Sequence, residues 1–408
     1  MFVMNLQSHI MKDKIVIKKC LYFLGLFALI SMSACSEEQK SVAENSGYEK
    51  PTVPYVPYDT TNFSTSENPF VCGTEGYDCY RIPTLAVTKN GTILAFMEGR
   101  RNNCDDAGDI DIVLKRSTDR GKTWSKIITV KDDGINRCQN QCPVVLSSGR
   151  ILLITCWNPG ATGTRSVFVT YSDDEGLTWA KEKNITPIVK LSGWGWYATG
   201  PCHGIVKQQE PNKGRVIVSS NHSENGKNYS HVIYSDDNGA TWALGGTVGY
   251  ENGNESTVAE LSNGNIMINM RNSDTNPNHF RMVSISKDGG KTFGDYYPDY
   301  ALIEPGSGSQ GVLLRHSINP VTGKANILFS NPNHGTSRRD GTIKLSENDG
   351  LTWTKSYKYA DNIDDNNWYT GYSDLALMDN GDVAVLYEKG YKYSRGIWFK
   401  IIPFSEIK

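Results

Sequence analysis

The chain has 408 residues, enough for two or three average domains or for one large β domain. Its 42 basic and 44 acidic residues leave a formal charge of −2, which argues against a broad nucleic-acid-binding surface. Hydrophobic residues make up 38% of the chain, charged residues 21%, and 39 residues are glycine. This composition is typical of a folded, turn-rich soluble protein and excludes a disordered chain or a protein with many membrane spans.

Residues 1–34 have the pattern of an export signal rather than of a folded element. Four lysines precede an apolar run from Leu21 to Ile30, which is too short for a mature transmembrane helix. Residues 31–35, Ser-Met-Ser-Ala-Cys, then resemble a bacterial lipobox, in which Cys35 would carry the lipid. We therefore expect export and a lipid anchor at the bacterial outer membrane. A plain secretory signal is the alternative.

Residues 35–66 contain three prolines and predict a flexible tether that leads to one domain over residues 67–408. Export permits disulfides, and Cys72 and Cys79 are the pair expected from their proximity in the sequence. Most of the other thiols are expected to be buried as small apolar groups. No Cys-x-x-Cys pairs with the spacing of zinc ligands occur.

A turn of polar residues and glycine, followed by an apolar strand, occurs six times after residue 66. The turn glycines are Gly91, Gly149, Gly214, Gly264, Gly323 and Gly381. The 290 residues from the first glycine to the last cover five steps, so the mean period is 58 residues. This length suits a four-stranded antiparallel blade. Six such repeats, with almost no helical periodicity, predict an all-β fold, a six-bladed β-propeller.

A second motif, Ser-x-Asp-x-Gly-x-Thr-Trp, follows each of the first five turns and is known as the Asp box. Its copies begin at Ser117, Ser172, Ser235, Ser286 and Ser346; the fourth has Phe293 in place of Trp, and the fifth has Asn348 in place of Asp. The Asp side chain can accept hydrogen bonds from its own turn, and the ring can pack against a sheet. Five copies at one blade position cannot share a single active site, so the motif predicts structure rather than catalysis. The sixth repeat lacks a box, and we expect an N-terminal strand to close the ring there.

The repeat also sorts polar residues by face of the propeller. Six residues stand 8 to 13 positions before the turn glycines, where the innermost strands start: Arg81, Gln141, His203, Glu255, Gln310 and Tyr372. Asp106, Arg271 and Arg338 belong to the same face, because they lie at the ends of second strands or in the loops that follow them. Three arginine forks on one face would suit a substrate that bears one carboxylate.

With these residues, the sequence resembles the bacterial exo-sialidases, a retaining glycoside hydrolase family. The resemblance is carried by the Asp boxes and by residues 80–85, 106–111, 197–205, 254–256, 270–272 and 371–375. It implies that Arg81, Arg271 and Arg338 bind the carboxylate of sialic acid. It also implies that Tyr372 is the nucleophile, that Glu255 is its partner and that Asp106 is the acid and base.

A tyrosine nucleophile is chemically reasonable for such a substrate. The anomeric carbon of sialic acid already carries a carboxylate, which would repel a carboxylate nucleophile. Because a free tyrosine ionises at about pH 10, Glu255 must take its proton. The nearby arginine cations are expected to favour the phenolate.

Two of these assignments have neighbours that compete for the same role. Asp105 and Asp109 are alternatives to Asp106, which is preferred because it opens the Asp-Ala-Gly-Asp run. Arg339 is the alternative to Arg338, which is preferred for its spacing to Gly341-Thr342. Both choices are tested by which side chains reach the site.

We therefore expect an exo-α-sialidase that acts on sialylated glycans and contacts no nucleic acid. The alternatives are an intramolecular trans-sialidase and a non-catalytic glycan-binding propeller. Trp194 and Trp196 contact either the glycan beyond the sialic acid or only the protein core. No phosphate-binding loop or dedicated calcium loop is apparent, so no cofactor and no metal are expected.

Overall fold

A computed structural model describes residues 67–407 except 161–163, 275–279, 307, 361–368 and 391–394. The chain divides into two compact units, residues 1–49 and 50–408, and only the second contains described residues. The expected signal over 1–34, the tether over 35–66 and the lipidated Cys35 lie outside the described residues. Within the described part, no helix is long and apolar enough to cross a membrane.

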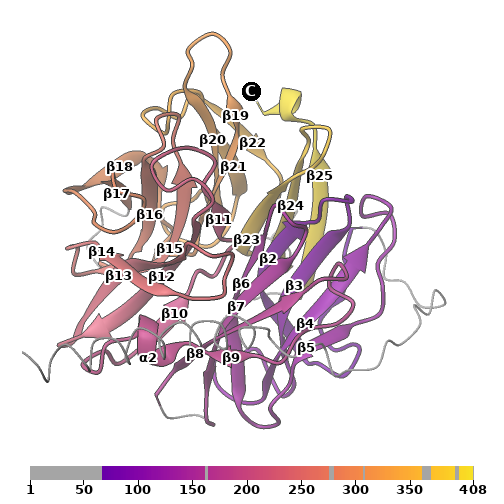
Figure 1. The fold of residues 1–408 in the computed structure, drawn as a ribbon. Coiled ribbons are helices and arrows are strands. Elements are labelled where there is room, and N and C mark those ends of the chain that lie inside the picture. The colour runs from indigo at the N-terminus through magenta and orange to yellow at the C-terminus, as the bar shows by residue number, and fades with distance from the viewer. Residues whose placement is uncertain are drawn as a thin grey trace, which may run out of the picture. The chain divides into compact units, whose positions relative to one another are not determined.

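Antiparallel strands make up most of the described structure (Figure 1). The largest sheet contains β2 (Cys79–Val87), β3 (Ile93–Arg100), β4 (Ile110–Ser117), β5 (Ile128–Lys131), β6 (Arg137–Val145), β7 (Ile151–Asn158), β8 (Ser166–Ser172) and β9 (Lys183–Asn184). Only the pairing of Ile110 with Arg137 joins β4 to β6, and it is parallel. On either side of this bridge, β2 to β5 and β6 to β9 each form an antiparallel group of four.

Four further sheets follow along the chain. One contains β10 (Tyr197–Thr199), β11 (Ile205–Val206), β12 (Val216–Glu224), β13 (Lys227–Ser235) and β14 (Ala243–Thr247), and the next contains β15 (Gly253–Glu260), β16 (Ile266–Asn272), β17 (Phe280–Ser286) and β18 (Tyr296–Ile303). The third contains β19 (Val312–Ile318), β20 (Ala325–Pro332), β21 (Gly341–Ser346) and β22 (Lys355–Lys358). The fourth contains β23 (Tyr369–Leu377), β24 (Val383–Gly390), β25 (Gly396–Ile402) and β1 (Phe70–Val71). The helical elements described are α2 (Thr186–Val189) and a 3-10 turn (Phe404–Glu406).

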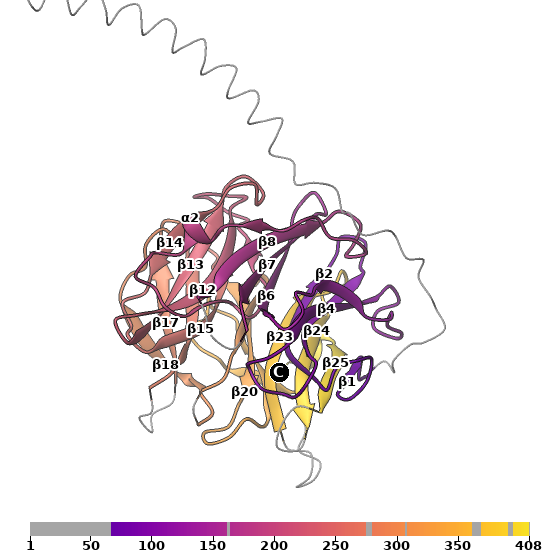
Figure 2. The ribbon, with the colours of Figure 1, turned by 90° about the horizontal axis from the view of Figure 1, so that it is seen from below.

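The innermost strands contact one another in a closed ring (Figure 2). Contacts run from β2 to β6, then to β11, β15, β19 and β23, and back to β2. The apolar core lies between adjacent sheets: Ile93 and Ala95 of β3 pack with Ala384 and Leu386 of β24, for example. The expected all-β, propeller-like architecture of mostly four-stranded antiparallel sheets is confirmed.

The sheet of β23, β24 and β25 is completed by a strand from the N-terminal end of the domain, as expected. Phe70 of β1 pairs with Ile397, and Val71 pairs with Gly396. The Phe399 amide also donates to the Glu67 carbonyl oxygen at 3.0 Å. The ends of the domain are therefore held together by backbone hydrogen bonds.

Each Asp box is a compact turn held by its own side chains. In the first box, Asp119 Oδ1 accepts from the Thr123 amide at 2.9 Å, and Ser117 Oγ accepts from the Gly121 amide at 2.8 Å. Gly121 has φ +80°, and a Cβ there would lie 2.2 Å from the Phe399 ring. The Trp124 ring is fully buried and meets Phe399 edge to face, with ring centroids 5.0 Å apart. The box therefore locks a turn and anchors one sheet to the next.

The expected pairing of Cys72 with Cys79 is wrong, because Cys79 forms its disulfide with Cys104. Cys79 lies opposite Arg100 in the pairing of β2 with β3, and Cys104 follows Arg100 in the loop after β3. Pairing of the strands, rather than nearness in the sequence, thus decides the partner. A crosslink over 25 residues stabilises the fold by about 3 kcal/mol in the chain-entropy treatment. The buried free thiols are Cys138, Cys142, Cys156 and Cys202, as expected.

Candidate active site

A bulge at the start of β2 directs Arg81 towards the centre of the face. The register shifts between Arg81 and Thr84, and Ile82 has φ +58°, which is rare for a β-branched residue. Glu388 Oε1 accepts from the Ile82 amide at 3.0 Å, and Gln141 Nε2 donates to the Ile82 carbonyl oxygen. These contacts from β24 and β6 stabilise an otherwise unfavourable backbone conformation.

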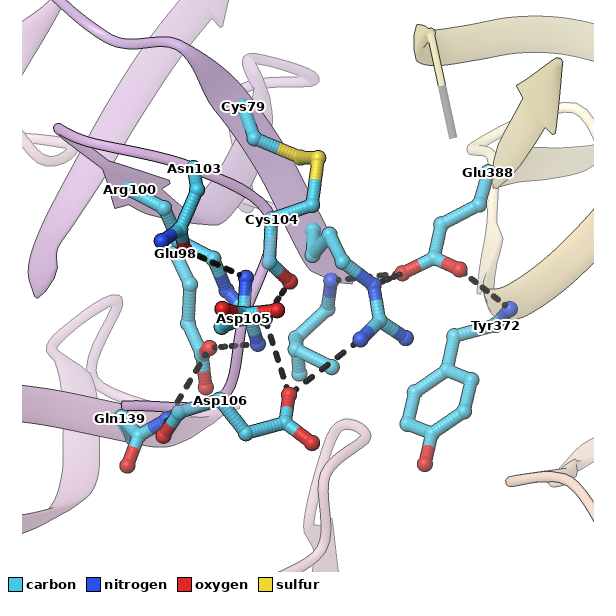
Figure 3. A network of polar contacts seen from close by, with 12 residues as sticks. Cys79, Glu98, Arg100, Asn103, Cys104, Asp105, Asp106, Gln139, Tyr372 and Glu388 are labelled. Atoms are coloured by element: carbon cyan, nitrogen blue, oxygen red, sulfur yellow. Dashed lines mark hydrogen bonds and ion pairs between the residues drawn. A yellow bond between two sulfur atoms is a disulfide. The ribbon is translucent and has the colours of Figure 1, made fainter. Parts of the chain in front are cut away.

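Glu388 also holds the Arg81 side chain. Its Oε1 lies 3.2 Å from Arg81 Nε, and its side chain is fully buried. Its Oε2 accepts from the Tyr372 amide at 3.2 Å (Figure 3). The same oxygen accepts from the Tyr369 hydroxyl at 2.9 Å. Although burial raises the pKa of Glu388, the Arg81 charge and these hydrogen bonds lower it overall. An ionised carboxylate therefore connects β2 with β23 beneath the site.

Tyr372, Glu255 and Arg271 form a compact hydrogen-bonded group. The Tyr372 hydroxyl donates to Glu255 Oε1 at 2.6 Å and accepts from Arg271 Nη1 at 3.1 Å. Arg271 Nη1 also donates to Glu255 Oε2 at 2.8 Å. These residues come from β23, β15 and β16, so three strands of two sheets meet at one phenol oxygen.

The other two arginines lie over the same tyrosine ring. The guanidinium carbon of Arg81 lies 5.5 Å from the Tyr372 ring centroid, and that of Arg338 lies 5.2 Å from it. Arg339, the alternative to Arg338, faces Asp340 at 3.7 Å instead. The structure thus brings the three expected guanidinium groups together around Tyr372.

The acidity of Tyr372 depends on burial as well as on the expected effect of the arginines. Burial raises its pKa most, and the negative charge of Glu255 raises it further. The three arginines lower the pKa but do not outweigh these effects. The arginines thus favour the phenolate, as expected, but the ring is only 5% exposed, and burial disfavours the charged form more strongly. Tyr372 is neutral in the free protein and holds its proton towards Glu255.

Asp106 stands at the edge of the group, in the loop between β3 and β4. Its Oδ1 lies 2.9 Å from Arg100 Nη1 and 3.3 Å from Arg81 Nη1, and its side chain is 75% exposed (Figure 3). Partial desolvation raises the pKa of this mostly exposed carboxyl, but the Arg100 and Arg81 charges hold the pKa below the usual range. Of the alternatives, Asp109 pairs with Arg101 at 3.4 Å, and no contact of Asp105 with the arginines of the site is observed among the described residues.

Sequence reasoning missed Glu388, Glu98 and Arg100. Glu98 and Glu388 each lie seven residues after a turn glycine, the same offset that relates Arg271 to Gly264. Glu98 Oε1 accepts from the Asn140 amide at 3.0 Å, just as Glu388 accepts from that of Ile82. Glu98 Oε2 also lies 2.7 Å from Arg100 Nη2. The repeat offset was therefore the signal that could have found both glutamates.

Three of the six residues that stand where innermost strands start form contacts between these strands: Gln141, His203 and Gln310. Gln141 donates to Ile82, as described above, and Gln310 Nε2 donates to the Ser373 carbonyl oxygen at 3.0 Å. His203 Nδ1 lies 2.7 Å from Asp374 Oδ1 of β23. Of the six residues at equivalent positions in the repeats, three therefore lie in the cluster around Tyr372, and the other three stabilise the ring of innermost strands.

The chain as a whole is similar to several known proteins. Residues 91–385 match the model of the BNR repeat-like domain family. The chain is 31% identical to a sialidase of Micromonospora viridifaciens, and the match covers 80% of this chain and 52% of that protein. It is also 31% identical to a sialidase of Paraclostridium sordellii, and this match covers 81% of this chain and 85% of that protein. The solved structure of a Hadza microbial sialidase, Hz136, matches with a TM-score of 0.72 and 28% identity over 85% of this chain and 69% of that one.

The chain spans about half the length of the Micromonospora relative, since 52% of that protein is matched. The match with the Paraclostridium sialidase nevertheless covers most of both chains. Together with the family match over residues 91–385, this similarity shows that the chain belongs to the bacterial exo-sialidase family.

Proposed function

We propose that the protein is an exo-α-sialidase that hydrolyses terminal sialic acid from glycoconjugates. The observation that carries the proposal is the Tyr372 hydroxyl, which lies 2.6 Å from Glu255 and 3.1 Å from Arg271. Arg81 and Arg338 lie over the same ring. A substrate with a carboxylate next to its reacting carbon would be bound by these cations with that carbon near the phenol oxygen.

In the first step, the Tyr372 oxygen attacks the anomeric carbon while Glu255 takes the phenol proton. The bond to the glycosidic oxygen breaks, and Asp106 gives that oxygen its proton. The product of this step is a tyrosyl-glycoside. Transfer of the proton to Glu255 during attack is needed because Tyr372 is neutral in the free protein and its pKa is raised.

Binding of substrate prepares Asp106 for this role. In the free protein, Arg81 and Arg100 lower its pKa, which favours the ionised form. A substrate carboxylate on Arg81 would offset part of that positive charge, and the pKa of Asp106 would rise. In the second step, Asp106 removes a proton from water, water attacks the anomeric carbon, and Glu255 returns its proton to Tyr372. Two displacements at one carbon give retention of configuration.

The number of blades is also a proposal. We count β2 to β5 and β6 to β9 as separate blades, because only the Ile110 and Arg137 pair joins them. Together with the other four sheets they make six blades, with β1 completing the last. An experimental structure with five or seven blades would contradict this count.

A lipid anchor at Cys35 and a location at the bacterial outer membrane remain proposals from the sequence. The test is metabolic labelling with a radioactive fatty acid in the native bacterium. The label is expected on the wild-type protein and not on Cys35→Ser. Equal labelling of both proteins would contradict the anchor.

A fluorinated sialic acid that slows the second step tests the mechanism. We expect a covalent adduct, which mass spectrometry of peptides should locate on Tyr372. An adduct on another residue would contradict the nucleophile. Proton NMR of the reaction with sialyllactose should show the α-anomer of free sialic acid first. A 2,7-anhydro product would indicate an intramolecular trans-sialidase, and no product would indicate a binding protein.

A further inference from the structure

Trp194 and Trp196 lie two residues apart but have different surroundings. Trp194 is 6% exposed and stacks on His222, with ring centroids 3.4 Å apart and planes at 7°. Trp196 is 42% exposed and stands just before β10, at the end where that strand starts. Trp194 is therefore part of the core, whereas Trp196 presents a large apolar ring to solvent.

One face of the Trp196 ring is covered by a buried cation. The guanidinium carbon of Arg165 lies 3.8 Å from the ring centroid, and Arg165 is only 3% exposed. Because Arg165 fills one face, the exposed area of the ring comes from the opposite face and the edges. The Trp196 amide also donates to Ser223 Oγ at 2.8 Å, which fixes the backbone beneath the ring. The ring is thus supported from below and open above.

Hydrogen bonds connect this ring to the loop of Asp106. Arg165 Nη2 donates to Gln139 Oε1 at 2.6 Å, and Gln139 Nε2 donates to the Asp106 carbonyl oxygen at 3.3 Å. The side chains of Arg165 and Gln139 therefore link the ring to the backbone of Asp106. The ring lies on the side of the site where the proposed acid stands.

We infer that the open face of Trp196 binds the sugar to which sialic acid is attached. This inference rests on the proposed function, because Asp106 can protonate the glycosidic oxygen only if the leaving sugar lies on its side. A neutral pyranose such as galactose has an apolar face of C–H groups that packs well on an indole ring. Trp196 is then a determinant of specificity for the leaving group and takes no part in bond breaking.

The test compares two substrates with the same sialic acid. The leaving group of sialyllactose is a sugar, which can stack on Trp196. The leaving group of sialyl fluoride is fluoride, which has no ring to stack. For Trp196→Ala, we expect kcat/KM for sialyllactose to fall about tenfold more than kcat/KM for sialyl fluoride, the size of a lost stacking contact. Trp196→Phe should recover most of that difference, because it restores an aromatic face.

Tyr300→Ala is the matched control, since Tyr300 is 71% exposed and lies on β18. It should leave the ratio of the two substrates at its wild-type value, and circular dichroism should show that all variants are folded. If Trp196→Ala changed kcat/KM equally for both substrates, or for neither, the inference would be overturned while the proposed function would stand. Wild-type protein that turns over neither substrate would overturn the proposed function and the inference with it.

Discussion

The Asp boxes and the cluster around Tyr372 are built in opposite ways. In the first box, the Asp119 carboxylate bonds with Ser117 and Thr123, which are two and four positions away. At the candidate active site, Tyr372 and Glu255 are 117 positions apart, and Arg81 and Glu388 are 307 apart. Local repeats therefore build the frame, and the frame brings distant residues together. Changes to the cluster should affect activity most, whereas changes to a box should affect stability alone.

Tyr372→Phe is the sharpest test of this difference. It removes the nucleophilic oxygen but little volume, so kcat should fall roughly 10³-fold or more. The melting temperature should change little. Tyr369→Phe is the matched control, because the Tyr369 hydroxyl contacts Glu388 and not Glu255. Near-normal turnover by Tyr372→Phe in a steady-state assay with sialyllactose would remove Tyr372 from the mechanism.

Glu388→Gln should affect both activity and stability. It removes the fully buried carboxylate next to the partly buried Arg81, which keeps only the exposed Asp106, and breaking a buried ion pair costs about 3–5 kcal/mol. Urea unfolding should measure this loss, and kcat/KM should fall because Arg81 is no longer fixed. The control is Glu347→Gln in the exposed pair with Lys355, where the change should be within about 0.5 kcal/mol. Equal losses in the two variants would contradict the role given to Glu388.

Asp119→Ala should lower the free energy of unfolding by about 1–2 kcal/mol, because hydrogen bonds of the box are lost. At a temperature where the variant is folded, kcat/KM should be unchanged. Although burial raises the pKa of Asp119, its bonds to Thr123 lower it overall. Since the folded pKa is depressed, this stabilisation is present above the ordinary carboxyl range and is lost as pH falls through the folded pKa. Urea titrations from neutral to acid pH should show the two proteins converging. A constant difference would contradict this linkage.

Among the effects on activity, that of Arg100→Gln should be the smallest, a shift in pH dependence, although losing its buried pair with Glu98 should also lower stability. Removing this charge raises the pKa of Asp106, so Asp106 keeps its proton at higher pH. The profile of kcat/KM for sialyllactose should therefore move towards higher pH. Sialyl fluoride needs no proton on its leaving group, so its profile should move less. A shift towards lower pH with sialyllactose would contradict Asp106 as the acid.

The sequence predicted those features that follow from the repeat. The turn glycines locate the starts of innermost strands, and Arg81, Glu255 and Tyr372 meet because those starts surround one axis. Glu388 was missed although the offset of Arg271 from its glycine marks the same position. The signal was available, but it requires comparison of second strands as well as first strands.

Other features depend on packing that no short motif encodes. The partner of Cys79 follows from the register of β2 with β3. The raised pKa of Tyr372 follows from burial, which the charges of neighbouring arginines do not reveal. Trp194 and Trp196 are the same residue type two positions apart, and only the direction of each ring distinguishes a core residue from an exposed one.

The pairing of β1 with β25 also has a consequence for protein synthesis. Val71 is made early, but its partner Gly396 leaves the ribosome only near the end of translation. Until then, β1 has no strand to pair with and the last sheet is incomplete, and unpaired edges of this kind promote aggregation. A nascent chain of this protein should therefore depend on chaperones until its final strands emerge, and truncation before residue 396 should yield insoluble protein.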